Sequence, residues 1–570
     1  MTLLDSDGRA DPGDFCNSIP ETINMKNGGT ILAQAIAQQG FDTFFYIMGA
    51  PMMQVEKACM QLGVRGIDVR HEQAAVMAAH AYTRVTGRPG VCMAASGPGT
   101  TNLITGVAHA WADCIPLVVL GGSSPLDQSG RGGFQEIDQL KMMESCTKWS
   151  ARVHHANRMP EMLDKAIRMA MSGKPGPVYL DLPADVLLEE VDAENVWFPA
   201  RYDPERRSRP AISRSELAEF MGLLGKASKP VILSGGGVGW SHAERELQAL
   251  VEGAGIPFYT TPQGRGCIPE DHALCFPTAR ATAFREADLI LVLGTRLNYI
   301  VGHAEPPRFN ANASLVRIDI DPEEIAGSQR LHLGIVADLR TALQQIGEAL
   351  PSDMRAAYQG WRDRLQGVEA EKSARQEQQL ANNNTPIHPM RLCREVRDFM
   401  DRDAILCVDG QEILTFGRQI IPSFVPNHRL NSGVFGTMGV GMPFGVGAKA
   451  AAPDKQVIVL HGDGSFGMNA MEFDTAVRHK LPVLVIISLN GGWTADPNKV
   501  KPGRDLGYTR FDQLAISLGG HGEYVESPEQ IRPALERAMA AVREGRPALV
   551  NVVTDANAQS SSVTFTRYAT

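Results

Sequence analysis

The stretch from Lys455 to Trp493 constrains the fold of this chain more than any other. It opens with a short apolar run rich in β-branched residues, Val457–Leu460, of the kind found in buried parallel strands. A glycine-rich turn follows, then apolar residues at helical spacing, then a second apolar run, Leu484–Leu489. We therefore predict a strand–helix–strand unit in which two parallel strands lie side by side.

Polar residues follow both predicted strands. Asp463 lies in the turn after the first strand, and Asn490 follows the second. Open α/β sheets bind ligands at the carboxyl ends of their strands, so we expect the two side chains to lie close together. A carboxylate and an amide oxygen suit Mg²⁺, and Gly462 and Gly464 let backbone N–H groups approach an anion. A helix cap or a turn explains either residue alone, but the pair predicts a diphosphate bound through a metal.

Composition excludes several classes of function. The chain has 570 residues, 44% of them hydrophobic, which is enough for several globular domains. A net charge of −9 with dispersed signs argues against a nucleic-acid partner. The nine cysteines include no CxxC pair, so they predict neither a zinc site nor a disulfide framework. The acidic N-terminus does not resemble a signal peptide, and no apolar run is long enough to cross a membrane, so we expect a cytoplasmic protein.

Alternating strand and helix patterns divide the chain into three α/β domains, each with a parallel sheet flanked by helices. Predicted strands of the first domain include Thr43–Ile47, Gly90–Ala94 and Ile115–Leu120. The second domain has a glycine-rich turn after a strand, which is a Rossmann-like pattern. A polar, charged stretch then predicts a long helix and an exposed linker. The expected boundaries are a tail at 1–25, domains at 26–188, 210–350 and 386–555, a linker at 351–385 and a second tail at 556–570.

The Gly-Asp-Gly turn, with 25 residues between it and the asparagine, resembles the signature of the thiamine-diphosphate (ThDP) enzymes. That family usually has two consecutive asparagines and uses the second; here leucine replaces the first. The resemblance implies that Asp463, Asn490 and the Gly492 carbonyl hold Mg²⁺. It also implies that Gly464 and Ser465 face the diphosphate of ThDP. The three domains would then be pyrimidine-binding, Rossmann-like middle and diphosphate-binding domains.

Glu72 lies where a predicted strand ends and a helix begins, a position that also favours an acidic residue through the helix dipole. In the ThDP family, a glutamate at this junction hydrogen-bonds N1′ of the aminopyrimidine and promotes removal of the proton from the thiazolium C2. Tyr46–Gly49 and Ser96–Asn102 resemble the flanking loops of the family. The resemblance implies that Glu72 is catalytic and that Gly49, Pro98 and Asn102 contact the cofactor.

A second glycine-rich stretch, Gly433–Gly439, resembles the segment that contacts the middle of the cofactor in this family. It implies that the Gly436 carbonyl accepts a hydrogen bond from the 4′-amino group and that Met438 supports the bent cofactor from below. Methionine is also a common core residue. Because Glu72 and Asp463 lie in different domains, the resemblance implies a homodimer or homotetramer with active sites at the subunit boundary.

Within the family, the chain most resembles 2-hydroxyacyl-CoA lyases and oxalyl-CoA decarboxylases. The resemblance covers nearly the whole chain and includes Gly133–Gln139, Tyr179–Asp185, Gly294–Asn298, Pro306–Arg308 and Arg429–Gly433. Gln135 falls where this subgroup places a polar residue against the thiazolium and the substrate. An amide is no strong base, but it can orient a hydroxyl group or a water molecule. Since the decarboxylases carry glutamate there, Gln135 favours the lyases.

An acyl-CoA substrate needs cationic partners for its phosphates. Arg265 and Arg418 match basic positions of the CoA-using subgroup, although each alone is more simply explained as a surface arginine. Trp493 and Thr494 depart from the isoleucine–tyrosine pair that relatives carry at the pocket wall. This departure leaves the acyl specificity open.

Two further segments hold candidate ligand contacts. Asp319 and Asp321 follow a predicted strand of the middle domain and are candidates for the ribose hydroxyls of a bound ADP. The end of the chain from Ser560 resembles a lid that closes over CoA in relatives, which would bring Arg567 near a phosphate and Tyr568 over the acyl pocket. A disordered end is the alternative explanation of this tail.

Together these features predict a ThDP- and Mg²⁺-dependent carbon–carbon lyase that cleaves a 2-hydroxyacyl-CoA to formyl-CoA and an aldehyde or ketone. Oxalyl-CoA decarboxylase is the first alternative, and a carboligase like acetolactate synthase or benzaldehyde lyase is the second. A ThDP-fold protein that binds nucleotide or CoA without turnover is the third. Intact Glu72, Asp463 and Asn490 argue against a protein without turnover.

Overall fold

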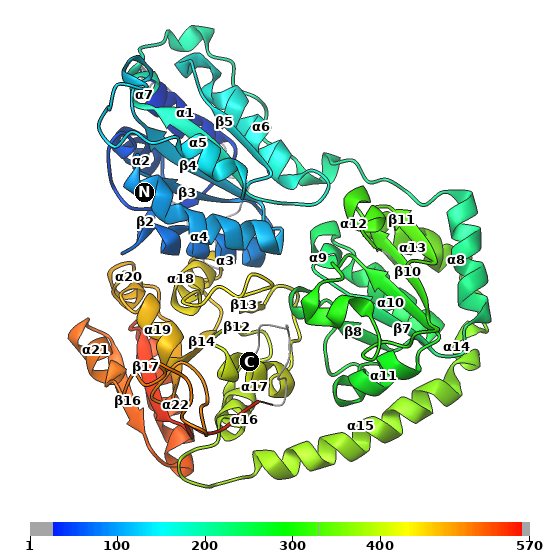
Figure 1. The fold of residues 1–570 in the computed structure, drawn as a ribbon. Helices are drawn as coiled ribbons and strands as arrows, with labels where there is room; N and C mark the ends of the chain where they lie inside the picture. Colours follow the sequence, from blue (N-terminus) through cyan, green and yellow to red (C-terminus); the bar gives the residue numbers. More distant parts are fainter. Residues whose placement is uncertain (1–26, 329, 561–570) are drawn as a thin grey trace, which may run out of the picture.

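The computed structural model describes residues 27–328 and 330–560. It contains three parallel β-sheets, each flanked by helices, which confirms the predicted α/β architecture (Figure 1). The sheets that begin and end the chain lie next to each other, and the middle domain lies to one side of them. Arg567 and Tyr568, and with them the part of the predicted lid beyond Ser560, lie outside the described residues.

The N-terminal sheet has the strand order β2-β1-β3-β4-β6-β5, with every neighbouring pair parallel. Its strands are β1 Thr43–Tyr46, β2 Arg65–Asp68, β3 Gly90–Ala94, β4 Leu117–Ser123, β5 Trp149–Arg152 and β6 Val178–Pro183. The flanking helices are α1 Gly28–Gln38, α2 Met53–Gln61, α3 Glu72–Thr86, α4 Pro98–Asp113, α5 Gln139–Glu144, α6 Met159–Met171 and α7 Ala184–Leu188. Strand β4 runs past its predicted end at Leu120 because its glycines continue to pair with β6.

The C-terminal sheet repeats this topology in the order β13-β12-β14-β15-β17-β16. Its strands are β12 Ile405–Asp409, β13 Arg429–Asn431, β14 Val457–Gly462, β15 Leu484–Leu489, β16 His521–Val525 and β17 Ala548–Val553. Its helices are α16 Pro389–Phe399, α17 Glu412–Ile420, α18 Gly441–Ala451, α19 Asp463–Met468, α20 Glu472–Arg478, α21 Phe511–Ser517 and α22 Pro528–Arg543. The predicted strand–helix–strand unit is confirmed, since β14 and β15 are parallel neighbours.

The middle sheet has five parallel strands in the order β11-β10-β9-β7-β8, a doubly wound order in which the first strand lies between the second and the third. Its strands are β7 Pro230–Ser234, β8 Phe258–Thr260, β9 Leu289–Leu293, β10 Ser314–Asp319 and β11 Leu333–Val336. Its helices are α8 Arg214–Lys226, α9 Gly237–Ser241, α10 Glu244–Ala254, α11 Arg280–Glu286, α12 Pro322–Ala326 and α13 Leu339–Ala349.

A long helix, α15 (Gln359–Leu380), connects the middle domain to the C-terminal domain (Figure 1). Its first half carries Trp361 and Leu365 into the core of the middle domain, and the Trp361 indole donates to the Pro230 carbonyl at 3.1 Å. Its second half is polar and crosses to the C-terminal domain. Its last residue, Leu380, is buried in the core of the C-terminal domain. The predicted linker at 351–385 is therefore largely a helix that is anchored at both ends.

Helices α3 and α18 join the N-terminal and C-terminal domains in one continuous hydrophobic core. A Cβ on Gly447 would lie 2.0 Å from the Ala78 carbonyl oxygen, so glycine is what allows these helices to approach. Phe444 of α18 packs against the rings of His80 and His109, with centroids 4.9 and 5.8 Å away. The two domains are thus held as a single packed body.

Two further features concern the helices and the cysteines of the described residues. Among the helices of the described residues, none combines the length and apolar character needed to cross a membrane. The eight cysteines in the described part of the chain are free, and six of them are buried. Buried thiols of this kind behave as small apolar side chains.

Candidate functional site

The carboxyl ends of β14 and β15 place Asp463 and Asn490 side by side. The two strands pair as far as Gly462 and Ser488, immediately before these residues. Asp463 Oδ2 accepts the N–H of Gly492 at 2.9 Å, and Asn490 Oδ1 accepts the same N–H at 3.2 Å. A shared donor therefore holds the predicted metal ligands together.

This cluster fits a magnesium ion. It offers a carboxylate oxygen, an amide oxygen and nearby backbone carbonyls, the hard donors that Mg²⁺ takes. Asp463 is 4% exposed, and burial raises its pKa to about 6. Since burial penalises the charged carboxylate, a divalent cation beside it would offset that penalty. The residues present suit a Mg²⁺ that carries a diphosphate.

One small cavity of about 20 Å³ collects these residues. The indole of Trp493 lies against Gly464 at the start of α19, where a Cβ would be only 2.6 Å from the ring. The indole therefore lies beside the place where the diphosphate is predicted to bind. The cavity is lined by all three predicted metal ligands and three predicted cofactor contacts: Asp463, Asn490, Gly492, Met438, Gly464 and Ser465.

The predicted pyrimidine-side residues lie together at the carboxyl edge of the N-terminal sheet. Glu72 is the first residue of α3, and Asn102 of α4 donates to Glu72 Oε2 at 2.9 Å. Pro98 is the first residue of α4. Gly49 follows β1, and a Cβ there would meet the Ala95 Cβ at 2.5 Å, so only glycine fits. The three motifs that carried the resemblance are thus neighbours in space.

Gln135 lies on the loop between β4 and α5 and is held against the same edge. Its backbone has a φ of +57°, in the left-handed region that is strained for a residue other than glycine. Ser96 Oγ donates to Gln135 Oε1 at 2.6 Å. A Cβ on Gly97 would lie 2.5 Å from the Gln135 carbonyl oxygen. These contacts fix the amide next to the Pro98 motif.

Within one chain, the predicted site falls into two groups. The lining of the cavity around Asp463 comes entirely from residues 389–558. Met438 lines this cavity and is 38% exposed, whereas Gly436, with a φ of +70°, does not line it. Glu72 also lies outside its lining. The diphosphate side and the pyrimidine side are therefore not assembled into one cavity.

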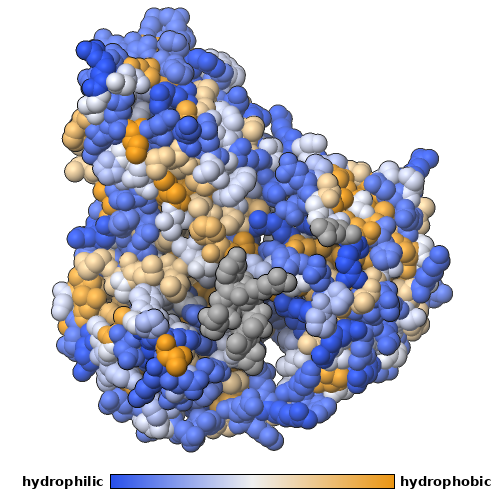
Figure 2. Space-filling view, in the orientation of Figure 1, coloured by the Kyte–Doolittle hydropathy of each residue, from blue (hydrophilic) through white to orange (hydrophobic). Residues whose placement is uncertain are grey.

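A much larger cavity, about 1100 Å³, lies between the middle domain, the second half of α15 and the C-terminal domain. Figure 2 shows the surface hollowed in this region, beside the polar side chains of α15. One carboxylate, Glu270, lines the cavity together with six cationic side chains. These are Arg265, Arg280, Arg308, Lys372, Arg375 and Arg418. A concave surface with this excess of positive charge attracts anions.

Both arginines predicted to contact CoA line this cavity, but their side chains have different partners. Arg265 forms an ion pair with Glu270 and donates to the Ile421 carbonyl at 2.9 Å. Arg418, near the end of α17, has a buried Nε without a hydrogen-bond partner among the described residues. Burial, together with the neighbouring Arg265, lowers the pKa of Arg418 to about 10. Arg265 is thus held in the cavity wall by Glu270, whereas no carboxylate pairs with Arg418 among the described residues.

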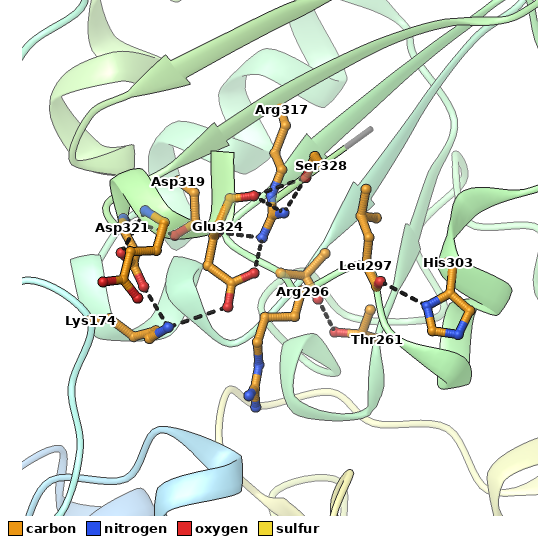
Figure 3. A network of polar contacts seen from close by, with 12 residues as sticks. Lys174, Thr261, Arg296, Leu297, His303, Arg317, Asp319, Asp321, Glu324 and Ser328 are labelled. Atoms are coloured by element: carbon orange, nitrogen blue, oxygen red, sulfur yellow. Dashed lines mark hydrogen bonds and ion pairs between the residues drawn. The ribbon is translucent and has the colours of Figure 1, made fainter. Parts of the chain in front are cut away.

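The aspartates predicted to contact ADP already have partners within the protein (Figure 3). Asp319 accepts a hydrogen bond from Arg317 at 3.2 Å, and Asp321 forms an ion pair with Lys174 of the N-terminal domain. Lys174 also lies 3.3 Å from Glu324. The adjacent cavity is about 110 Å³, below the roughly 300 Å³ typical of small-molecule sites. The structure gives the ADP prediction no support.

Sequence reasoning missed several residues of these cavities. Arg280, Arg308, Lys372 and Arg375 belong to no motif and come from segments far apart in the chain. Glu412, the first residue of α17, also lines the cavity around Asp463. It follows closely on the end of strand β12. The rule that identified Asp463, a polar residue after a parallel strand, could therefore have found Glu412 as well.

Comparison with models of known families gives three matches along the chain. Residues 26–142 match the N-terminal TPP binding domain of thiamine pyrophosphate enzymes. Residues 217–346 match the central domain, and residues 413–552 match the C-terminal TPP binding domain. Each match falls within one of the three domains, and the first and third include both groups of predicted cofactor residues.

Individual relatives are similar over nearly their whole length. The chain is 31% identical to 2-hydroxyacyl-CoA lyase 1 of Homo sapiens, covering 95% of this chain and 96% of the relative. It is 34% identical to a probable acetolactate synthase of Mycobacterium bovis (93% and 96%) and 30% identical to oxalyl-CoA decarboxylase of Escherichia coli K12 (96% and 98%). Whole-chain identity therefore does not separate these three activities. The chain belongs to the thiamine pyrophosphate, or ThDP, enzyme family.

Proposed function

We propose that the chain is a ThDP- and Mg²⁺-dependent carbon–carbon lyase that cleaves a 2-hydroxyacyl-CoA to formyl-CoA and an aldehyde or ketone. The observation that carries this proposal is the basic cavity. Coenzyme A brings three phosphate groups on its nucleotide end, and a cavity of about 1100 Å³ with six cations offers both the space and the charge for them. A small 2-keto acid such as pyruvate would need neither.

The position of the cavity supports the same substrate class. Gln559 lines the basic cavity, while Ala558 lines the cavity around Asp463. The two cavities are thus neighbours across a short piece of chain. A thioester whose phosphates bind near Arg418 would extend its pantetheine arm toward the predicted cofactor pocket.

The site residues have distinct roles in the proposed reaction. Bound ThDP would supply a nucleophilic carbon and store the electron pair released when the C1–C2 bond breaks. Asp463 and Asn490 would hold the Mg²⁺ that anchors the diphosphate. Glu72 would share a proton with the pyrimidine through Oε1, since Oε2 accepts from Asn102. Gln135, already oriented by a neighbouring serine, would hydrogen-bond the 2-hydroxyl group.

We also propose that the active enzyme is a homodimer or homotetramer. Within one chain, Glu72 and Asp463 do not line a common cavity. Met438, the residue predicted to support the cofactor, is 38% exposed on its own chain. A second copy that brings its Glu72 against this surface would complete the site.

A product assay separates the candidate functions. The purified protein with Mg²⁺ and ThDP is incubated with a panel of 2-hydroxyacyl-CoAs, with oxalyl-CoA and with pyruvate, and products are identified by mass spectrometry. Formyl-CoA and an aldehyde or ketone from a 2-hydroxyacyl-CoA would support the proposal. Formyl-CoA from oxalyl-CoA alone would make the chain a decarboxylase, and acetolactate from pyruvate alone would make it a carboligase. No turnover of any substrate, with ThDP bound, would indicate a binding protein.

A further inference from the structure

A short segment, Asp555–Ser560, forms the wall between the cofactor pocket and the basic cavity. Asp555 and Ala558 line the pocket around Asp463, whereas Gln559 lines the basic cavity. Ala558 and Ser560 are both only 8% exposed. The segment is therefore packed into the protein at the place where the two cavities meet.

Glu412, which also lines the pocket around Asp463, contacts this wall. Its Oε2 accepts the backbone N–H of Ser560 at 2.9 Å, and its Oε1 accepts the hydroxyl of Thr494 at 3.2 Å. Thr494 directly follows Trp493, whose ring lies against Gly464. One carboxylate thus connects the wall to the loop that carries the predicted metal ligands after β15.

We propose that Glu412 is a positioning residue that fixes the wall segment and couples it to the metal-binding loop. The chemistry of the side chain supports this role, because a carboxylate accepts both hydrogen bonds at once. Glutamine at this position can still accept from the Ser560 N–H and donate to the Thr494 hydroxyl, but it lacks the negative charge of the carboxylate. Hydrogen bonds to a carboxylate are also about twice as strong as neutral ones.

The coupling gives the cofactor pocket a means to act on the basic cavity. A diphosphate bound beside Gly464 would lie next to the Trp493 indole, and in this proposal its binding shifts that ring and the adjacent Thr494. Glu412 passes the shift to Ser560 and hence to the wall that the thioester must pass. Only the effect on the passage of the thioester rests on the proposed function. The contacts of Glu412 with Ser560 and Thr494 are independent of it.

Hydrogen–deuterium exchange of the full chain without substrate tests the contacts directly. In Glu412→Ala, which removes the acceptor, the amides of peptides covering 555–560 should exchange roughly tenfold faster than in the wild type. Glu412→Gln keeps a neutral acceptor and should show a smaller increase. Glu536→Gln, a change at an exposed position on α22, serves as the matched control and should leave exchange unchanged. Equal exchange in the wild type and both Glu412 variants would overturn the proposal.

Tryptophan fluorescence tests the coupling separately. Mg²⁺ and ThDP should change the fluorescence of the wild type, and Trp493→Phe should lose that change. In the wild type, the same addition should alter exchange at 555–560. In Thr494→Val, which keeps Glu412 but loses the hydroxyl, fluorescence should still respond while exchange at 555–560 should not. An unaltered exchange response in Thr494→Val would contradict the coupling. Because no substrate is present, these results stand even if the CoA activity is not found.

Discussion

The middle domain borders two cavities with opposite character. The basic cavity is about 1100 Å³, and its Arg418 has a buried N–H without a hydrogen-bond partner among the described residues. The cavity beside Asp319 and Asp321 is about 110 Å³, and both carboxylates already bind cations of the protein. In the sequence, the two arginines and the two aspartates looked like equally weak candidates.

The difference shows that a charged residue after a strand or a turn is not by itself a ligand contact. Asp321 lies opposite Lys174 of another domain, so its charge is used to hold two domains together (Figure 3). Arg418 lies near a second cation, Arg265, which lowers its pKa further. Like charges brought together around an open cavity favour an anionic ligand, whereas opposite charges in contact favour a structural role.

The largest expected effect is a loss of turnover without a loss of substrate binding. Glu72→Gln should lower turnover by about 10²–10⁴-fold, because glutamine cannot share the proton that the carboxylate carries. The basic cavity lies apart from Glu72 and should still bind the CoA part of the substrate. Binding of desulfo-CoA, an unreactive analogue, should stay within about twofold as measured by calorimetry. Near-normal hydrogen–deuterium exchange at C2 of bound ThDP in this variant would contradict the role of Glu72.

The second effect tests whether the cofactor pocket is a metal site distinct from the basic cavity. Asp463→Ala removes the anionic oxygen from a cluster with few protein ligands, so Mg²⁺-dependent ThDP affinity should fall at least ~100-fold. Calorimetric titration of ThDP at several Mg²⁺ concentrations measures this change. Desulfo-CoA binding serves as the internal control. An affinity for ThDP like that of the wild type would remove Asp463 from the metal site.

A third, smaller effect tests the basic cavity itself. Arg418→Ala should lower kcat/KM for the CoA substrate by roughly 10–100-fold, the loss expected for one charge-assisted bond to a phosphate. Arg402→Ala is the matched control, because Arg402 is an exposed arginine paired with Asp271 at 2.7 Å. Steady-state kinetics should show no loss in the control. Similar losses in both variants would mean that Arg418 has no special place in the cavity.

The smallest effect is expected at the other cavity. Lys174→Ala breaks a partly exposed ion pair between domains, so kcat/KM should change by less than about threefold and the free energy of unfolding by about 1 kcal/mol or less. Addition of ADP should leave the Tm of the wild type unchanged. A rise in Tm with ADP that is lost in Asp321→Asn would show that this cavity also binds a nucleotide. The proposed difference between the two cavities would then be wrong.

The parts of the fold that the sequence predicted well are central strands. Leu484–Leu489 is a continuous apolar run buried on both faces, and the observed β15 has the same bounds. The edge strands β5 and β16 were not predicted. Their residues are mostly half-buried, so they lack the continuous apolar run that marks a central strand.

In the predicted site, residues that are close in the sequence could be placed together, whereas residues from different domains could not. Asp463 and Asn490 belong to one strand–helix–strand unit, so their proximity follows from local rules. The cations of the basic cavity come from the middle domain, α15 and α17. Nothing in the polar pattern of α15 indicates that Lys372 would face Arg418 across a cavity rather than solvent. Only the packing of the three domains brings these charges together.

One binding measurement tests the assignment of the basic cavity to coenzyme A most directly. Desulfo-CoA is titrated into the full-length protein loaded with Mg²⁺ and ThDP, in the wild type and in Arg418→Ala, at low and high salt. We predict saturable binding by the wild type that weakens with salt, and an affinity at least tenfold lower in the variant. No binding by the wild type, or equal affinity in the two proteins, would contradict the assignment of the basic cavity to coenzyme A.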